Sequence, residues 1–244
     1  MIRIDDREGV RLVTLDRPEA MNAFDTALYR AAADALDTAR LDDAVKIVAV
    51  TGEGRAFSAG QDLKEMARLA AGEPIESGFP VFLEALERFD KPLMAAVNGV
   101  AIGIGFTMLP HCDLVLMAET ARCRVPFAEL GVPPEAASSL LFPARMGWQQ
   151  ASRILFTSDW VDAQEAVRLG IALSVHPADE LLDAAMALAS RIATAPLAAL
   201  RAIKTAMLAT RASDVAAARA REEEAFATLL SSAATVAALD EFGR

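Results

Sequence analysis

The sequence predicts an α/β fold with parallel strand pairing, followed by a helical C-terminal region. Short apolar strand patterns at 45–52, 93–99 and 113–119 alternate with helical patterns in the first half of the chain. Such alternation is typical of a parallel sheet covered by helices. From about residue 134 onward the pattern becomes almost wholly helical. With 244 residues, 54% of them hydrophobic, the chain is long enough to bury a large core.

The N-terminal residues predict two short strands and then a helix. Ile2 and Ile4 alternate with polar residues, residues 10–15 form a second strand pattern, and residues 5–9 supply the turn between them. Asp25 is a typical helix cap and opens a helix with one apolar face. That face is formed by Leu28, Ala32, Ala35, Leu36 and Ala39.

The remaining elements follow from the same patterns. Helices are predicted at 62–71, 80–90 and 102–110, between the buried strands. In the helical half, one short strand is predicted at 171–175. We therefore expect an α/β core over residues 1–194, and a helical region over residues 195–244 that begins next to Pro196.

Composition excludes several classes of function. The net charge of −10 opposes binding to nucleic acid and to anionic membranes. The N-terminus shows no signal-peptide pattern, and the longest apolar run, residues 99–109, is too short to span a membrane. Cys112 and Cys123 match neither a disulfide framework nor a zinc pattern. We therefore expect a cytoplasmic protein with two reduced thiols and without a metal site, a membrane partner or a nucleic-acid partner.

Two glycine-rich junctions stand between a predicted strand and a predicted helix. They are "RAFSAGQDLKEM" (55–66) and "NGVAIGIGFTML" (98–109). Each junction should present unpaired N–H groups at the start of a helix, and two such ends aimed at one point would stabilise negative charge on an oxygen. The plainer interpretation is that the glycines only relieve crowding. Neither junction matches a dinucleotide-binding, phosphate-binding or serine-hydrolase motif.

The sequence resembles the crotonase superfamily, the enoyl-CoA hydratase/isomerase family. Four segments carry the resemblance in order and spacing, and together with a fifth at 162–172 they cover nearly the whole chain. The four are "DRPEAMNAF" (16–24), "RAFSAGQDLKEM" (55–66), "AAVNGVAIGIGFTMLPHCDLVLMAE" (95–119) and "VPFAELGVPPEAASSLLFPARMG" (125–147). The resemblance implies a crotonase-like (ββα)n spiral core and an acyl-CoA substrate.

The resemblance assigns roles to the two junctions. It implies that the backbone N–H groups of Gln61 and Ile104 bind the thioester oxygen, and that the backbone near Ala23, Ala59 and Leu63 binds the adenine of coenzyme A. Arg17, Arg55 and Lys64 are candidates for the phosphates, and Asp62 is expected to cap the following helix. The residues expected at the substrate are Ala23, Ala59, Gly60, Asp62, Leu63, Lys64, Gly103 and Phe127.

The catalytic segment resembles the Δ3,Δ2-enoyl-CoA isomerase branch most closely. Thr107 and Phe127 stand where hydratases of the family carry two glutamates, although a slip of two residues would bring Glu129 near the second position. In the isomerase branch, a glutamate in a Pro-Glu turn is the catalytic base, and here that residue is Glu135. One carboxylate is enough to move a proton between C2 and C4 of the acyl chain. The alternative is that Glu135 only begins a helix.

We therefore expect an enzyme that shifts a double bond in an enoyl-CoA through an enolate held by backbone N–H groups. The alternatives are a 2-enoyl-CoA hydratase that uses Glu129 or Glu135, and a non-catalytic acyl-CoA-binding relative. The resemblance implies a homotrimer or hexamer and no cofactor apart from the coenzyme A of the substrate. His111 and His176 are expected to have structural roles, with His111 favoured as a cation at a helix end.

Overall fold

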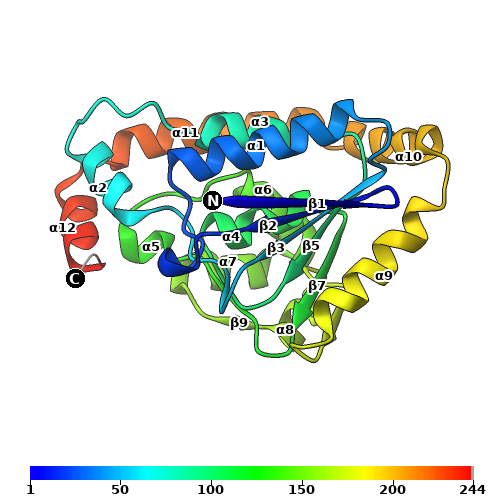
Figure 1. The fold of residues 1–244 in the computed structure, drawn as a ribbon. Helices are drawn as coiled ribbons and strands as arrows, with labels where there is room; N and C mark the ends of the chain where they lie inside the picture. The colour runs from blue at the N-terminus through cyan, green and yellow to red at the C-terminus, as the bar shows by residue number, and fades with distance from the viewer. Residues whose placement is uncertain (243–244) are drawn as a thin grey trace.

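The computed structural model describes residues 1–242 and contains a six-stranded sheet at its centre (Figure 1). The strand order is β1-β2-β3-β5-β7-β10, and all neighbours pair in parallel except the antiparallel hairpin of β1 and β2. The strands are β1 (Ile2–Arg7), β2 (Val10–Leu15), β3 (Ile47–Gly52), β5 (Leu93–Val97), β7 (Leu114–Ala118) and β10 (Ser174–His176). The predicted parallel α/β architecture is confirmed.

A second, smaller sheet follows from residues that the sequence analysis did not assign to strands. Its order is β4-β6-β8-β9, with β4 (Ala56–Ser58), β6 (Val100–Ile102), β8 (Arg122–Arg124) and β9 (Val161–Asp162). Strands β4, β6 and β8 each follow closely on a strand of the large sheet and precede a helix. The strand–strand–helix unit is thus repeated three times, as the (ββα)n prediction required.

Helices surround the two sheets (Figure 1). They are α1 (Thr26–Leu41), α2 (Leu63–Ala70), α3 (Phe79–Arg88), α4 (Ile104–Thr107), α5 (Phe127–Leu130), α6 (Ser138–Met146), α7 (Trp148–Thr157), α8 (Ala163–Arg168), α9 (Leu181–Ala193), α10 (Leu197–Ala209), α11 (Ala212–Leu229) and α12 (Ala233–Phe242). Helices α1 and α3 run side by side, and α12 returns to pack against α2 and α5. The C-terminal helices therefore reach the part of the molecule that carries the first glycine-rich junction.

Two predicted elements need correction. The helix predicted at 102–110 consists of strand β6, the single turn α4 and a 3-10 turn, Leu109–His111. It is interrupted because Gly103 has a φ of +52° and Pro110 cannot continue an α-helix. The strand predicted at 171–175 is shifted to Ser174–His176, since the N–H groups of Ile171 and Ala172 still bond to the end of α8.

The helical C-terminal region is fixed to the sheet by a buried ion pair. Lys204 of α10 is only 3% exposed and places Nζ 2.7 Å from Oδ1 of Asp113, whose other oxygen accepts the N–H of Leu93 at 2.8 Å. Helix α10 begins after Pro196, close to the predicted start of this region. The division at residue 194 stays a prediction, and residues 243–244 of the second part lie outside the described residues.

The helices also bear on whether the chain could cross a membrane. Within residues 1–242, no single helix is both long and apolar enough to do so. Only α9 and α10 taken together meet that length and composition, and they are bent by 106° relative to each other.

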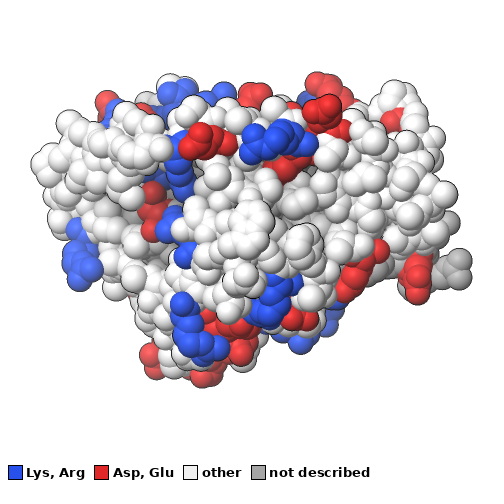
Figure 2. All heavy atoms as spheres, turned by 180° about the vertical axis from the view of Figure 1, so that it is seen from behind, with Lys and Arg blue, Asp and Glu red and all other residues white. Residues whose placement is uncertain are grey.

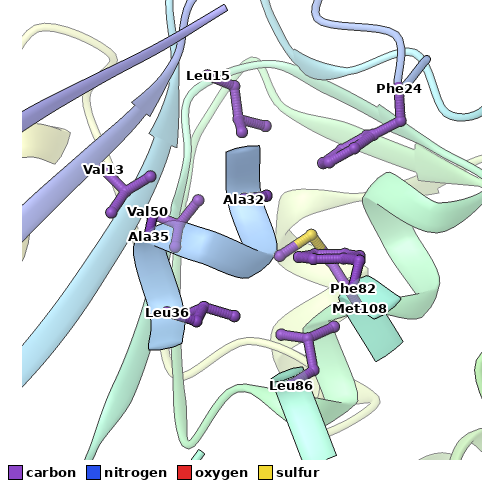
Figure 3. A pocket seen from close by; sticks show the side chains of 10 residues that line it. All are labelled: Val13, Leu15, Phe24, Ala32, Ala35, Leu36, Val50, Phe82, Leu86 and Met108. Carbon is purple, nitrogen blue, oxygen red and sulfur yellow. The ribbon is translucent and has the colours of Figure 1, made fainter. Parts of the chain in front are cut away.

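The core between α1, α3 and the large sheet leaves one small apolar cavity of about 10 Å³ (Figure 3). Its walls carry no polar side chain, so a water there would find no hydrogen-bond partner and the cavity should stay dry. It is too small for a ligand and belongs to the core. The residues around it are Val13, Leu15, Phe24, Ala32, Ala35, Leu36, Val50, Phe82, Leu86 and Met108.

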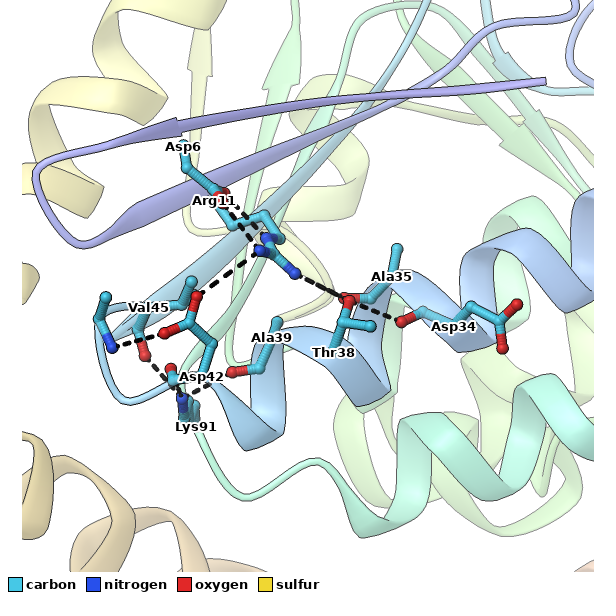
Figure 4. A network of polar contacts seen from close by, with 10 residues as sticks. Asp6, Arg11, Asp34, Ala35, Thr38, Ala39, Asp42, Val45 and Lys91 are labelled. Atoms are coloured by element: carbon cyan, nitrogen blue, oxygen red, sulfur yellow. Dashed lines mark hydrogen bonds and ion pairs between the residues drawn. The ribbon is translucent and has the colours of Figure 1, made fainter.

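A polar network connects β2 to the C-terminal end of α1 (Figure 4). Arg11 donates to the carboxylate of Asp6 and to the hydroxyl of Thr38 at 2.9 Å. Beside it, Lys91 donates from Nζ to the carbonyl oxygens of Ala39, Asp42 and Val45 at 2.6, 2.7 and 2.7 Å. The ammonium group thereby satisfies the carbonyl of Ala39, which the end of α1 leaves without an intrahelical partner, and two carbonyls that follow the helix.

We expect Lys91→Met to lower the free energy of unfolding by about 3 kcal/mol, because buried carbonyls lose their only charged donor. Denaturant titration at neutral pH measures this change. Arg88→Met is the matched control, since it removes an exposed ion pair to Asp37 at the end of α3 and should cost less than about 1 kcal/mol. Equal losses in the two variants would contradict this account of the network.

Candidate active site

The two glycine-rich junctions lie side by side because the strands before them are paired. Strands β4 and β6 are parallel, with Ser58 opposite Ala101. Gly60 has a φ of +91°, and a Cβ atom placed on it would lie 2.8 Å from the carbonyl oxygen of Ile102 and 3.6 Å from Cα of Gly103. A side chain at residue 60 would therefore force the two junctions apart.

A second close approach fixes the junctions from the other side. A Cβ atom on Gly105 would lie 2.7 Å from the carbonyl oxygen of Ser58 and 3.0 Å from its Cβ. Ser58 is itself held, since its hydroxyl donates to the carbonyl of Asn22 at 2.9 Å and accepts the N–H of Gly60 at 3.1 Å. Glycine is thus required at position 105 by close contact.

The N–H group of Gln61 points away from Phe24, the residue to which both of its neighbours in the chain bond. Phe24 donates to the carbonyl of Gly60 at 2.6 Å and accepts the N–H of Asp62 at 2.8 Å. Because successive N–H groups of an extended segment alternate in direction, the N–H of Gln61 faces the opposite side. Within residues 1–242 it donates to no acceptor, and Nε2 of the same side chain is buried without a partner.

The N–H group of Ile104 begins helix α4. The carbonyl of Gly103 accepts from the N–H groups of Phe106 and Thr107, both at 2.8 Å, while the N–H of Ile104 precedes the first intrahelical bond. In the part of the chain that the structure describes, this group also donates to no acceptor. The two candidate donors therefore belong to adjacent junctions, and both N–H groups remain available.

The segment predicted to bind coenzyme A is held together by Arg17. Its guanidinium donates to the carbonyl of Ala23 at 3.0 Å and to the carboxylate of Asp62 at 2.8 Å. Asp62 also accepts the N–H groups of Lys64 and Glu65, at 3.0 and 3.3 Å, which confirms it as the cap of α2. Among the phosphate candidates, Arg17 is therefore engaged in this ion pair, whereas Lys64 is exposed.

The other residues expected around the ligand occupy the same region of the chain. Ala59 donates its N–H to the carbonyl of Met21 at 2.9 Å, and Leu63 is the first residue of α2. Arg55 is exposed and close to Met21, with a guanidinium nitrogen 3.5 Å from the thioether sulfur. The early segment 16–24 and the first junction thus meet in the folded chain, although 30 or more residues separate them.

The carboxyl group of Glu135 lies next to the paired junctions. Its Oε1 atom would be 3.8 Å from a Cβ atom placed on Gly103, the residue before Ile104. Burial raises the pKa of Glu135 to about 8, with a further rise from the charge of Glu222 and an opposing effect of the Thr107 hydroxyl. Although Thr107 is close enough to affect this pKa, its Oγ1 has no partner with hydrogen-bond geometry. A buried carboxyl group with a raised pKa thus lies beside Gly103, the residue before the free N–H group of Ile104.

An unusual turn follows Glu135. Ala136 and Ala137 both adopt left-handed backbone angles, with φ of +56° and +57°. His111 Nε2 lies 2.8 Å from the carbonyl oxygen of Ala136, and Glu222 accepts the N–H of Ala137 at 2.7 Å. Because left-handed backbone is unfavourable for residues with a Cβ atom, these contacts are needed to hold the turn.

Glu222 is a residue that the sequence analysis missed. It lies on α11 and is only 6% exposed, with its second oxygen accepting the N–H of Ser139 at 2.9 Å. The run "REEEAF" reads as a solvated acidic face. However, Glu222 follows the buried residues Val215 and Ala218 at helical spacing, and this signal could have placed it on the buried side.

The two positions where hydratases of the family are expected to carry glutamates are occupied here by Thr107 and Phe127. Thr107 is fully buried beside Glu135, and Phe127, the first residue of α5, is 5% exposed and apolar. Glu129, the alternative acid, is on the surface and forms an ion pair with Arg124. Of the two glutamates considered from the sequence, Glu135 is the buried one and lies beside Gly103, whereas Glu129 is exposed.

The histidines and cysteines have structural environments. Burial lowers the pKa of His111 to about 4, so this side chain is neutral and the expectation of a cation there is wrong. His176 pairs with the hydroxyl of Ser174 at 2.8 Å. Cys112 and Cys123 are free and buried, as expected, and burial raises the pKa of the Cys112 thiol to about 12. Across residues 1–242, no cluster of three or more His, Cys, Asp or Glu side chains could hold a metal ion.

Comparison with known proteins agrees with these features. A family model described as enoyl-CoA hydratase/isomerase matches residues 5–243. A curated relative from Escherichia coli, named 2,3-dehydroadipyl-CoA hydratase, is 34% identical over 226 residues, which cover 93% of this chain and 89% of that protein. A second E. coli relative, named 1,2-epoxyphenylacetyl-CoA isomerase, is 32% identical over 82% of this chain and 79% of its own length.

A solved structure gives the same result for the fold. The crystal structure of an enoyl-CoA hydratase/isomerase from Pseudoalteromonas atlantica superposes with a TM-score of 0.94 and 33% sequence identity. The match covers 99% of this chain and 96% of the other. The fold that the four sequence segments implied is therefore confirmed.

We expect the Glu135 carboxyl group to titrate at a pH of about 8, since burial and the nearby charge of Glu222 disfavour its anion. Protein labelled with ¹³C at the glutamate carboxyls should show one resonance that moves with this midpoint and is absent in Glu135→Gln. A Glu135 resonance that titrates near 4.5, the ordinary value for glutamate, would contradict the proposed environment.

Proposed function

Because the chain belongs to the enoyl-CoA hydratase/isomerase family, we propose that it shifts the double bond of an enoyl-CoA thioester, with Glu135 as the catalytic base. The observation that carries this proposal is the position of the Glu135 carboxyl group beside Gly103, in the junction that contains the unpaired N–H group of Ile104. One proton-transferring group and one site for an oxyanion are what a double-bond shift requires.

The N–H groups of Gln61 and Ile104 are the proposed oxyanion hole. Both are free of internal hydrogen bonds within residues 1–242, and both are fixed by the contacts between the junctions. Donors that are already in place stabilise charge on the thioester oxygen without reorganising during the reaction. Because they belong to the backbone, this function does not depend on the side chains at positions 61 and 104.

The proposed step moves one proton and one pair of electrons. The Glu135 carboxylate removes a proton from C2 of a 3-enoyl-CoA, and the C–H electrons form the C2–C1 double bond of a dienolate as the thioester oxygen becomes negative. The same carboxyl group then returns the proton to C4. The thioester carbonyl re-forms and the double bond ends between C2 and C3. These two proton transfers balance without an oxidant or a reductant. The reaction therefore needs no coenzyme apart from the one that the substrate carries.

We place coenzyme A along the segment that Arg17 and Asp62 hold together. The backbone near Ala23, Ala59 and Leu63 would bind the adenine, as expected from the resemblance. Because Arg17 is engaged by Asp62, the exposed side chains of Lys64 and Arg55 are the better candidates for phosphate oxygens. Binding through neutral backbone suits a protein with a net charge of −10.

The second candidate is a 2-enoyl-CoA hydratase, favoured by the name of the 34% identical relative, 2,3-dehydroadipyl-CoA hydratase. A hydratase must hold and activate a water molecule next to the double bond. Here neither the apolar Phe127 nor the hydroxyl of Thr107 can exchange a proton with water at neutral pH, and Glu129 is paired with Arg124 at the surface. Glu135 would have to perform both proton transfers, so we rank this candidate below the isomerase.

The remaining proposals concern the protein in the cell. We propose a cytoplasmic homotrimer or hexamer. Several large apolar side chains are strongly exposed in the single chain, among them Trp148, Phe156 and Ile203. Figure 2 shows that the middle of the rear face is largely uncharged, with basic and acidic side chains interspersed around it. Sedimentation velocity decides this proposal, since a species of 25.9 kDa at micromolar concentration would contradict it.

We expect Glu135→Gln to lower kcat for double-bond migration by about 10²–10⁴-fold, the usual contribution of a positioned acid–base group. The substitution keeps the size of the side chain and removes the base. Acyl-CoA binding, measured by calorimetry, should barely change because the coenzyme is held elsewhere. Glu129→Gln is the matched control, and its kcat should remain close to that of the wild type because Glu129 is on the surface.

An unchanged kcat in Glu135→Gln would exclude Glu135 as the base, and a loss confined to KM would limit it to substrate binding. If the wild type binds acyl-CoA tightly but catalyses neither migration nor hydration, the protein is a non-catalytic acyl-CoA-binding relative.

We expect the wild-type protein to convert 3-enoyl-CoA to 2-enoyl-CoA much faster than it hydrates crotonyl-CoA. The reason is that neither Thr107 nor Phe127 can exchange a proton with the added water at neutral pH. Both reactions can be followed by the absorbance of the conjugated thioester at a single enzyme concentration. Hydration at a rate equal to or above that of migration would favour the hydratase.

A further inference from the structure

Glu222 is a buried carboxylate that no step of the proposed reaction uses. It projects from α11, 85 residues beyond the turn that it contacts, and both of its oxygens are occupied. One oxygen accepts the N–H of Ala137 at 2.7 Å, and the other accepts the N–H of Ser139 at 2.9 Å. These N–H groups begin helix α6, where the chain itself provides no acceptor.

The turn that Glu222 contacts determines where the Glu135 carboxyl group lies. Ala136 and Ala137 are both left-handed, which is unfavourable without glycine, and the carbonyl of Glu135 accepts the N–H of Ser138 at 2.9 Å. Glu222 holds the turn through N–H groups, while His111 contacts the carbonyl of Ala136 from the other side. Release of Glu222 would free the backbone directly after Glu135.

We propose that Glu222 is a positioning residue for Glu135. It fixes the left-handed turn through two N–H groups, and it places a negative charge close to the Glu135 carboxyl group. This inference rests on the proposed role of Glu135 as the base. Glu222 itself does not reach the substrate in this account and acts only through the turn and through its charge.

The charges around the two carboxyl groups agree with this role. Glu135 faces Glu222, the hydroxyl of Thr107 and the buried phenol of Tyr29, whose pKa is raised by burial and by the charge of Glu135. The neighbours of Glu222 are the hydroxyl and N–H of Ser139, the N–H of Ala137 and the guanidinium of Arg221. His111 completes the turn and is neutral, because burial lowers its pKa.

The order of ionisation follows from these neighbours. Burial raises the pKa of Glu222, but two backbone N–H groups, the Ser139 hydroxyl and Arg221 all favour its anion. Glu135 has only the opposing effect of Thr107. Glu222 therefore loses its proton first, and its charge then disfavours the anion of Glu135. Removal of the Glu222 charge should lower the pKa of Glu135.

Two substitutions distinguish the effect of the Glu222 charge from the effect of its side-chain length. Glu222→Gln removes the charge and turns an NH₂ group toward one of the two N–H donors. Glu222→Asp keeps the charge but is one carbon shorter. Glu223→Gln is the matched control, because Glu223 is the next residue of α11, is exposed and pairs with Arg219. For each variant, we would record the pH dependence of kcat/KM and the ¹³C titration of the Glu135 carboxyl.

In Glu222→Gln, we expect the acid limb of kcat/KM and the Glu135 midpoint to move to lower pH by at least half a unit. We expect kcat at high pH to fall about 10- to 100-fold with little change in KM, as for a displaced catalytic group. Glu222→Asp should keep the acid limb of the wild type while kcat falls. Glu223→Gln should leave both unchanged.

If Glu222→Gln lowers Tm but leaves the acid limb and the Glu135 midpoint in place, Glu222 only stabilises the fold and the proposal is wrong. If Glu222→Gln does not fold, Glu222→Asp decides: an unchanged kcat in that variant would overturn the positioning role. A failure of the proposed function can be told apart from a failure of this inference. If Glu135 is not the base, Glu135→Gln keeps full activity. The ¹³C titration midpoint of Glu135 still shows whether Glu222 acts on that carboxyl group.

Discussion

The close packing of two glycine-rich junctions is the constraint on which the proposed site depends. Strands β4 and β6 pair in parallel, and Gly60 and Gly105 let the backbone of each junction touch the other. The N–H groups of Gln61 and Ile104, one in each junction, are without acceptors in the described part of the chain. A Cβ atom at either glycine would lie within 2.8 Å of a carbonyl oxygen, so the arrangement allows little variation.

A second constraint comes from the far end of the chain. The turn after Glu135 is unfavourable in isolation, and it is held by His111 from the 3-10 turn after α4 and by Glu222 from α11. Helix α11 is therefore part of the site in our account, although it contributes no group to the reaction. Burial of the Glu135 carboxyl group, together with the charge of Glu222, raises its pKa to about 8.

Much of the fold could be predicted from the sequence, because long apolar strands and amphipathic helices leave clear periodic patterns. The four strands of the smaller sheet could not, since two or three residues are too few to show a period. The roles of Gln61, Ile104 and Glu135 came from the resemblance to a family, and the structure adds their proximity. Glu222 was missed because its partners are distant in sequence and only its helical spacing hinted at burial. The neutral state of His111 could not be predicted, because it follows from the complete burial of the ring, which lowers its pKa.

The most direct test of the central claim is a crystal structure with a bound analogue of the dienolate thioester. The account predicts that the analogue's oxygen lies about 3 Å from the backbone nitrogens of both Gln61 and Ile104, with the Glu135 carboxyl group within reach of C2 and C4. A thioester oxygen bound elsewhere, or a Glu135 carboxyl group turned away from the acyl chain, would contradict it.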